Sequence, residues 1–151
     1  MRCLLVATVA MTACCDPGSS ATGVLHATGD PLGTWDFVPN ATCRNGYDGD
    51  FIGVDLSDGV RAVRFLADPA YGYTLVIATG GDIAYPTVVY HAADCSTFEA
   101  NLSTDSGDDN GDAESGGFVV VCPAVAPNTM TVGVHGAIDF AHCDSDSIEG
   151  S

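Results

Sequence analysis

Apolar side chains recur at every second position along much of the chain, and this two-residue period constrains the fold more than any other feature. The clearest case is the stretch 131–142, where Val132, Val134, Ile138 and Phe140 share one parity. Such alternation indicates a half-buried strand, because successive side chains of a strand point to opposite faces of the sheet. No ten-residue window shows a sustained 3.6-residue apolar period. The sequence therefore predicts an all-β domain.

Short β-rich runs are separated by turn residues such as Asn45-Gly46, Asp58-Gly59 and Gly80-Gly81. The runs predict about eight strands, at 33–38, 51–56, 60–67, 73–79, 87–91, 97–103, 118–122 and 131–142, and a short earlier strand at 24–27 would be a ninth. Many short strands with close turns favour a single antiparallel β-sandwich or barrel. Parity predicts a core that contains Trp35, Phe37, Ile52, Val54, Leu56, Phe98, Leu102, Val132, Val134, Ile138 and Phe140.

The first residues of the chain are typical of an export signal. Arg2 supplies a positive charge, residues 4–13 form a short apolar run, and the small residue Ala13 directly precedes Cys14. The run is much shorter than the ~20 residues of a membrane-spanning helix, so it predicts a signal peptide.

The tetrapeptide Met11-Thr12-Ala13-Cys14 resembles the lipobox of bacterial lipoprotein signals. The resemblance implies cleavage before Cys14 and attachment of lipid to its sulfur, with Cys15 as the fallback and a soluble secreted product as the alternative. The mature protein would then be extracytoplasmic and anchored to a bacterial membrane. Asp16 bears on lipoprotein sorting in some bacteria and favours the outer membrane or the cell surface.

These features divide the chain into four parts. Residues 1–13 are the expected signal peptide, and residues 14–23 are the lipidated cysteine with a tether rich in Pro, Gly and Ser. Residues 24–143 form the all-β domain, and residues 144–151 form an acidic tail.

The charge of the chain is strongly negative. It has no lysine, and loss of Arg2 with the signal leaves three arginines against twenty acidic residues, a net charge of −17. Such a surface repels phosphate backbones and anionic headgroups, which argues against nucleic-acid binding and against a basic membrane contact. Membrane association is therefore expected through the lipid on Cys14, because more than one acyl chain suffices for stable anchoring.

Four cysteines lie in the body of the chain: Cys43, Cys95, Cys122 and Cys143. An even number of widely spaced cysteines in an exported protein favours two disulfides. Zinc ligands usually come in C-x₂₋₄-C pairs, whereas the nearest of these cysteines are 21 residues apart.

If strand 97–103 pairs with strand 118–122, Cys95 and Cys122 lie together at the open end of that hairpin. The remaining pair would then be Cys43–Cys143. A simple up-and-down meander would place these two at opposite ends, so the second bridge requires a crossover connection or else a different pairing.

Gly33-Thr34-Trp35 opens a predicted strand, and this G-x-W resembles the first strand of lipocalin and avidin-like barrels. The resemblance implies a tryptophan that plugs the floor of a barrel. The basic residue that covers this tryptophan from the last strand is missing, because no Lys or Arg follows Arg64. The alternative, which we favour, is a core tryptophan with no further role.

The loop 105–114 holds five carboxylates in ten residues. Oxygen ligands of this kind suit Ca²⁺, and the candidate ligands are Asp105, Asp108, Asn110, Asp112 and Glu114. The twelfth position counted from Ser106 is Gly117, where an EF-hand would place a bidentate Glu. A solvated acidic loop without a cofactor is therefore the expectation, and calcium is the alternative.

The sequence contains no P-loop, dinucleotide fingerprint or Gly-x-Ser-x-Gly elbow, and its histidines, His26, His91, His135 and His142, have no metal-binding spacing. These observations favour a non-catalytic, lipid-anchored envelope protein with a structural or binding role toward an unidentified protein or glycan. The alternatives are an exported hydrolase whose site is assembled from loops, and a calcium-dependent surface binding module. A deep pocket with converging His and carboxylate groups would favour the enzyme, and a filled core would favour the module.

Overall fold

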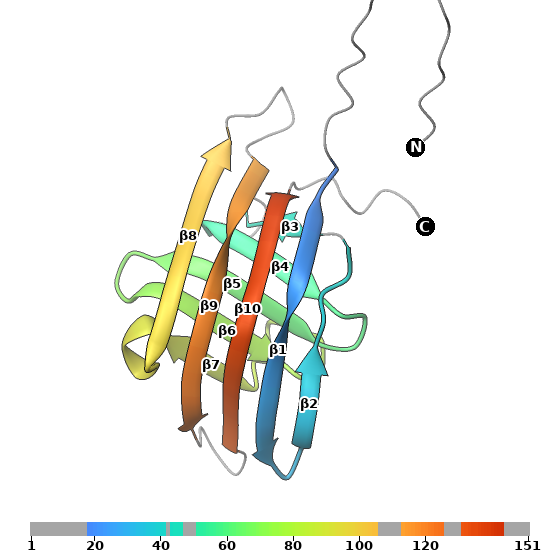
Figure 1. The fold of residues 1–151 in the computed structure, drawn as a ribbon, viewed down its shortest axis with the longest axis vertical. Coiled ribbons are helices and arrows are strands. Elements are labelled where there is room, and N and C mark those ends of the chain that lie inside the picture. The colour runs from blue at the N-terminus through green and yellow to red at the C-terminus, as the bar shows by residue number, and fades with distance from the viewer. Residues whose placement is uncertain (1–17, 42, 47–50, 106–112, 126–130, 144–151) are drawn as a thin grey trace, which may run out of the picture.

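Two antiparallel sheets of five strands each build the domain (Figure 1). The computed structural model describes residues 18–41, 43–46, 51–105, 113–125 and 131–143. The elements in chain order are β1 (Ser20–Asp30), β2 (Gly33–Phe37), β3 (Arg44–Asn45), β4 (Gly53–Ser57), β5 (Ala62–Asp68), β6 (Gly72–Ala78), β7 (Val88–His91), the short 3₁₀ turn η2 (Ala92–Asp94), β8 (Thr97–Asp105), β9 (Ala113–Val125) and β10 (Thr131–Cys143). The predicted all-β antiparallel fold is confirmed, and it is a sandwich of two separate sheets.

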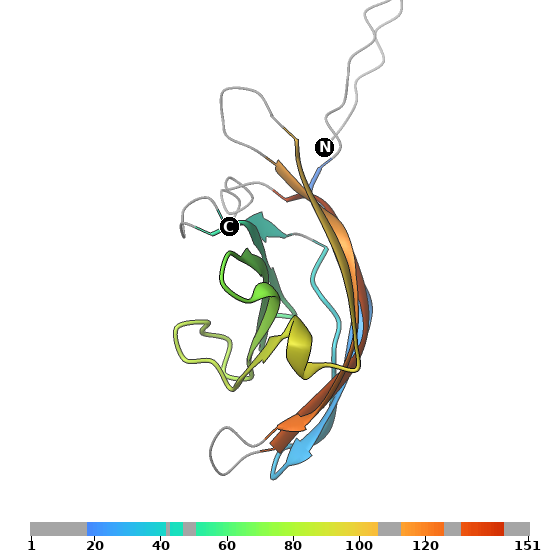
Figure 2. The same cartoon turned by 90° about the vertical axis from the view of Figure 1, so that its left-hand side faces the viewer.

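The first sheet, sheet A, has the order β2-β1-β10-β9-β8, and the second, sheet B, has the order β3-β4-β5-β6-β7. The chain therefore leaves sheet A after β2, builds all of sheet B as one meander, and returns through η2 to β8. The N-terminal and C-terminal strands pair with each other in sheet A, from Ser20 opposite Ala141 to Asp30 opposite Thr131. Sheet A curves around sheet B, and the strands of the two sheets run across one another (Figures 1 and 2).

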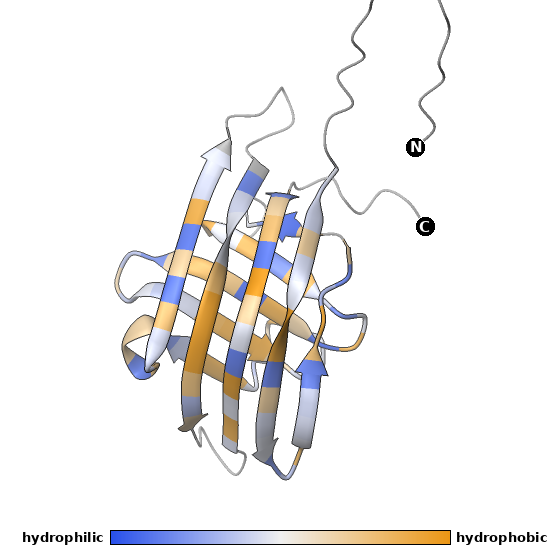
Figure 3. Ribbon diagram, in the orientation of Figure 1, coloured by the Kyte–Doolittle hydropathy of each residue, from blue (hydrophilic) through white to orange (hydrophobic). Residues whose placement is uncertain are grey.

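The space between the sheets is filled by apolar side chains from both of them. The largest fully buried ones are Tyr90, Phe37, Phe65, Leu25, Leu56, Leu75, Ile77 and Ile138. Hydropathy alternates along β8 and β10 of sheet A, because one face packs on sheet B and the other meets solvent, whereas the middle of β9 is apolar on both faces (Figure 3). In the described part of the chain no helix is long and apolar enough to cross a membrane.

Most of the predicted core is buried. Seven residues are confirmed as core: Phe37, Val54, Leu56, Val132, Val134, Ile138 and Phe140. Three others, Trp35, Phe98 and Leu102, are half-buried and pack against it. The prediction that Ile52 belongs to the core is wrong, because this residue is 58% exposed. It precedes the first residue of β4, and Gly53 adopts a φ of +153° there, so the two-residue parity of β4 does not extend back to it.

The strand boundaries differ from the expected ones where pairing outweighs local composition. β1 begins at Ser20, so residues 20–23, expected in the tether, are strand. Full pairing with β10 supplies their hydrogen bonds. A Cβ at Gly23 would lie 2.2 Å from the carbonyl oxygen of Ala137, which explains the glycine at this position. β9 likewise extends well beyond 118–122, because it pairs with β10 on one side and with β8 on the other. The short strand β3 was not predicted.

Both predicted disulfides are present, Cys43–Cys143 and Cys95–Cys122. The β8–β9 hairpin places Thr97 opposite Val121, which brings Cys95 next to Cys122 as expected. The crossover that the Cys43–Cys143 bridge required is the connection from β2 to β3. Each disulfide thus ties one of the two connections between the sheets to a strand of sheet A.

Tyr90 of β7 links the two sheets by a polar contact. Its side chain is fully buried, and its hydroxyl donates a hydrogen bond to the backbone carbonyl of Val132 in β10. Burial raises the pKa of Tyr90 to about 12, because the phenolate would lose its hydration. The Tyr90 hydroxyl therefore holds its proton more tightly in the folded state than in the unfolded state, where the pKa of a tyrosine is about 10.

We expect the stability that Tyr90 contributes to be fully present below pH 10 and to be lost as the pH rises toward 12. The loss should be about 1–2 kcal/mol. Urea unfolding of the wild type and of Tyr90→Phe between pH 8 and 11 measures it. The variant should start about 1–2 kcal/mol less stable, because the Val132 carbonyl loses its donor, and its stability should fall less steeply above pH 10. Parallel curves for the two proteins would contradict this assignment.

Candidate functional site

The outer face of sheet A carries two groups of exposed polar side chains. This face consists of the side chains that alternate with the buried ones along β2, β1, β10, β9 and β8. The pairing registers arrange them in rows that cross the strands. One row passes through Gly117 and carries Asn101 and Asp139, and another passes through the pair His26–His135 and carries Asp36.

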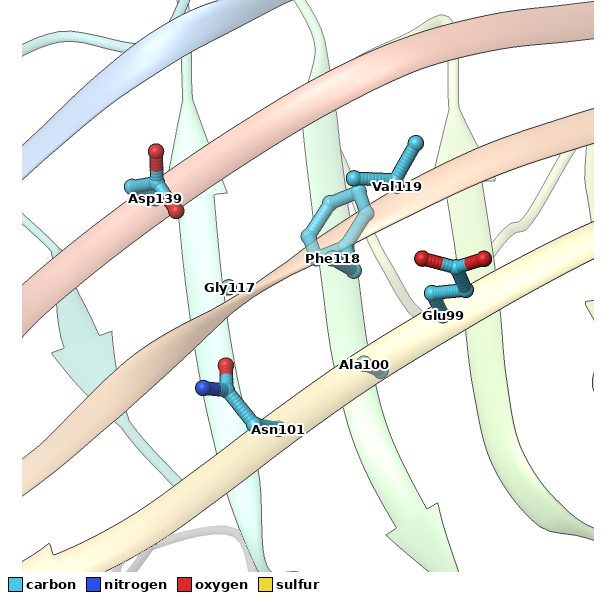
Figure 4. A pocket seen from close by; sticks show the side chains of 7 residues that line it. All are labelled: Glu99, Ala100, Asn101, Gly117, Phe118, Val119 and Asp139. Carbon is cyan, nitrogen blue, oxygen red and sulfur yellow. The ribbon is translucent and has the colours of Figure 1, made fainter.

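The row through Gly117 forms an open hollow of about 300 Å³. Gly117 of β9 lies opposite Asn101 of β8 on one side and Asp139 of β10 on the other. Figure 4 shows that Asn101 and Asp139 flank the glycine, and that Glu99 lies farther along β8, beside Val119. A Cβ at Gly117 would lie 2.5 Å from Oδ1 of Asp139, so the missing side chain makes room for that carboxylate. Two carboxylates and one amide in this hollow disfavour anions and offer hydrogen-bond acceptors to a neutral or cationic group.

The second row contains two histidines and an aspartate from three neighbouring strands. His26 of β1 lies opposite both His135 of β10 and Asp36 of β2. The Nδ1 of His26 is 2.7 Å from Oδ1 of Asp36, and the ring centres of the two histidines are 5.2 Å apart. The side chains of His26 and Asp36 are 45% and 54% exposed, so this row is open to solvent.

Sequence reasoning missed this row because β1 and β10 are more than a hundred residues apart in the chain. The partner of His135 in the sheet, His26, comes from the other end of the chain. One signal was available: a hairpin centred on Pro31 pairs His26 with Asp36.

A second pocket, of about 290 Å³, lies at Trp35 and is lined by Leu32, Thr34, Trp35, Val60, Arg61 and Thr79. The guanidinium of Arg61 lies 4.8 Å from the centre of the Trp35 ring, a cation–π contact. The basic residue over the tryptophan therefore comes from the turn before β5 and not from the last strand. The Nε1 of Trp35 is buried and has no hydrogen-bond partner in the described residues.

Asp58 holds Arg61 in this position. Its Oδ2 accepts a hydrogen bond of 3.0 Å from Nη1 of Arg61, and its Oδ1 accepts the backbone N–H groups of Val60 and Arg61. Burial alone would raise the pKa of Asp58, but these hydrogen bonds and the guanidinium charge outweigh it and lower the pKa. Asp58 therefore stays ionised and fixes the Arg61 side chain over Trp35.

The residues proposed from sequence as calcium ligands are only partly described. Asp108, Asn110 and Asp112 lie outside the described residues, and Asp105 is the last residue of β8. Glu114 is 6% exposed, and its Oε1 accepts a hydrogen bond from Thr104. Among the described residues, no three His, Cys, Asp or Glu side chains are arranged to hold a metal ion.

The expected lipidation site, Cys14, and its fallback, Cys15, lie outside the described residues, which begin at residue 18.

Comparison with known proteins adds no family to this description. No family model matches the chain, and neither a curated protein nor a solved structure matches it.

Proposed function

We propose that this chain is a lipid-anchored binding module of a bacterial cell envelope, held to the membrane through Cys14 and presenting the outer face of sheet A to a partner. The observation that carries the binding role is the filled interior. Large apolar side chains from both sheets occupy the space between them, and the polar side chains of the rows through Gly117 and His26 lie outside it on an open face. A rigid, side-chain-filled sandwich is suited to presenting a surface.

The two disulfides support the extracytoplasmic part of the proposal, because such bonds form and persist in oxidising compartments. The chain also enters the domain close to its expected anchor. Residue 18 is four positions after Cys14, a span of at most about 14 Å. A lipid on Cys14 would therefore hold the start of β1 near the bilayer.

Lipidation is tested by growing bacteria that express the full-length protein with a radiolabelled fatty acid. We expect label on the wild type and on Cys15→Ala, and no label on Cys14→Ala, since the lipid is attached to the Cys14 sulfur. Mass spectrometry of the mature N-terminus should find a chain that begins at a modified Cys14. An unmodified chain that begins elsewhere would contradict the anchor and favour a secreted product.

A hydrolase is the second candidate, because a histidine held by a carboxylate is half of a common catalytic arrangement. His26 and Asp36 form such a pair at 2.7 Å. The described residues provide no serine or cysteine hydrogen-bonded to His26, and the pair lies on an open face rather than in the hollow at Gly117. Hydrolysis of a panel of activated esters that is lost in His26→Gln would favour the enzyme over the module.

A further inference from the structure

Asp36, His26 and His135 form a row in which a carboxylate contacts one of two neighbouring imidazole rings, and the proposed binding role does not require this arrangement. The three residues belong to β2, β1 and β10, which are consecutive strands of sheet A, and they occupy directly opposite positions on its outer face. We propose that His26 and His135 together bind one late first-row transition-metal ion, such as Zn²⁺, Ni²⁺ or Cu²⁺. The inference goes beyond the proposed function and does not depend on the lipid anchor.

The distance between the two rings fits one shared ion. A metal–nitrogen bond of about 2.0–2.1 Å places the ring centre about 3.2 Å from the metal, and two such rings at the tetrahedral angle have centres about 5.2 Å apart. The observed separation of the ring centres is 5.2 Å. The two imidazoles are therefore already spaced as ligands of one ion, and the pairing of β1 with β10 holds their backbones in place.

Asp36 orients one of the two ligands. Its Oδ1 lies 2.7 Å from Nδ1 of His26, so this nitrogen carries a hydrogen, and in the neutral ring the lone pair available to a metal is that of Nε2. A carboxylate on the second ring nitrogen is the common arrangement around metal-binding histidines, where it fixes the tautomer and makes the ligand more basic. Asp36 acts as a positioning residue here, because the metal contacts the histidine and not the carboxylate.

The site is open, so solvent completes the coordination. His26 is about half exposed, and the described residues offer no third His, Cys, Asp or Glu ligand. Two imidazole nitrogens favour Cu²⁺, Ni²⁺ and Zn²⁺ over Ca²⁺ and Mg²⁺, which prefer oxygen ligands. The net charge of −16 raises the local concentration of cations at the surface. The site is therefore an exchangeable surface site that selects the metals imidazole prefers.

The test is isothermal titration calorimetry of the full-length protein in detergent at pH 8, with ZnCl₂ and, separately, NiCl₂. Iodoacetamide first blocks any free thiol, so that cysteines outside the two disulfides do not bind metal. We expect one site per chain, with a Kd at least tenfold higher in His26→Gln and in His135→Gln. His91→Gln is the matched control, because His91 lies on sheet B, where it contacts Tyr71 and Thr74. It should retain the wild-type Kd.

The variant Asp36→Asn tests the orientation of the His26 ring separately from the presence of the two histidine ligands. It keeps an oxygen acceptor for Nδ1 of His26 but loses the charge, and we expect a Kd that rises by about tenfold. Equal Kd values for the wild type and both histidine variants would overturn the proposal and assign the binding to carboxylates. Equal Kd values of the wild type for Ca²⁺ and for Zn²⁺ would overturn it in the same way. A second measurement needs no variant: the paramagnetic resonance spectrum of the Cu²⁺-loaded wild type should show two equatorial nitrogen ligands, and a spectrum with oxygen ligands alone would also overturn it.

Discussion

Replacing Cys43 and Cys143 together by alanine should lower the free energy of unfolding by about 4.7 kcal/mol, the largest effect we expect from any pair of substitutions. The bridge joins residues 100 positions apart. Its removal frees a long loop in the unfolded chain, and the chain-entropy relation for a loop of this length predicts that value. The bridge also fixes the β2–β3 connection to the end of β10, so the variant loses the link between this connection and sheet A. Both cysteines are buried, and alanine adds no polar group there.

Urea unfolding followed by circular dichroism measures this loss. Cys95→Ala with Cys122→Ala is the matched control, because these residues are 27 positions apart and the same relation predicts about 3.6 kcal/mol. The ratio of the two effects is informative. An equal or larger loss from the shorter loop would contradict the entropic account and indicate that local contacts at the β8–β9 hairpin dominate. Reduction of the wild type with dithiothreitol should lower stability at least as much as the longer bridge alone.

Phe65→Ala should destabilise the domain by about 3–5 kcal/mol, the usual range for truncating a buried phenylalanine. Phe65 of β5 is fully buried at the centre of an aromatic group built from both sheets. The centre of its ring lies 4.9 Å from that of Phe118, 5.9 Å from Phe140 and 6.5 Å from Phe98, all in sheet A, and 5.3 Å from Tyr73 in sheet B. Removing the ring leaves a cavity where the two sheets meet.

The same urea measurement applies to this variant, with two controls. Phe65→Leu keeps most of the volume and should cost about 1–1.5 kcal/mol. Val121→Ala removes methyl groups from a side chain that is 44% exposed on the outer face of sheet A, and it should change stability by less than about 0.5 kcal/mol. Similar losses for Phe65→Ala and Val121→Ala would contradict the assignment of Phe65 to the centre of the core.

Much of the fold is predictable from local sequence because strands leave a two-residue signature. Along β10, one parity carries Val132, Val134, Ile138 and Phe140, and all four are buried. The β8–β9 hairpin also follows from sequence, since its two runs lie close in the chain and their ends bring Cys95 next to Cys122. These predictions depend on residues that are neighbours in sequence, where local patterning and turn chemistry act directly.

The candidate site is less predictable because non-local pairing builds it. Each of His26, His135 and Asp36 has an unremarkable local context, and they meet only when β1 pairs with both β10 and β2. The contact of Arg61 with Trp35 has the same origin, since it joins the turn before β5 in sheet B to β2 in sheet A. Neither contact leaves a periodic signal in the sequence.

The sequence by itself determined the class of the fold, the burial of alternate residues and the cysteines available for bridging, because each depends on side-chain chemistry and local spacing. Only the tertiary structure decided that the domain is a sandwich of two sheets rather than a barrel, and that the first and last strands lie side by side. The physical reason is that many strand orders satisfy the same alternation. In the order adopted here, the inner faces of the two sheets bury their apolar side chains against each other and both disulfides close. That same order places the histidine pair on the outer face of sheet A.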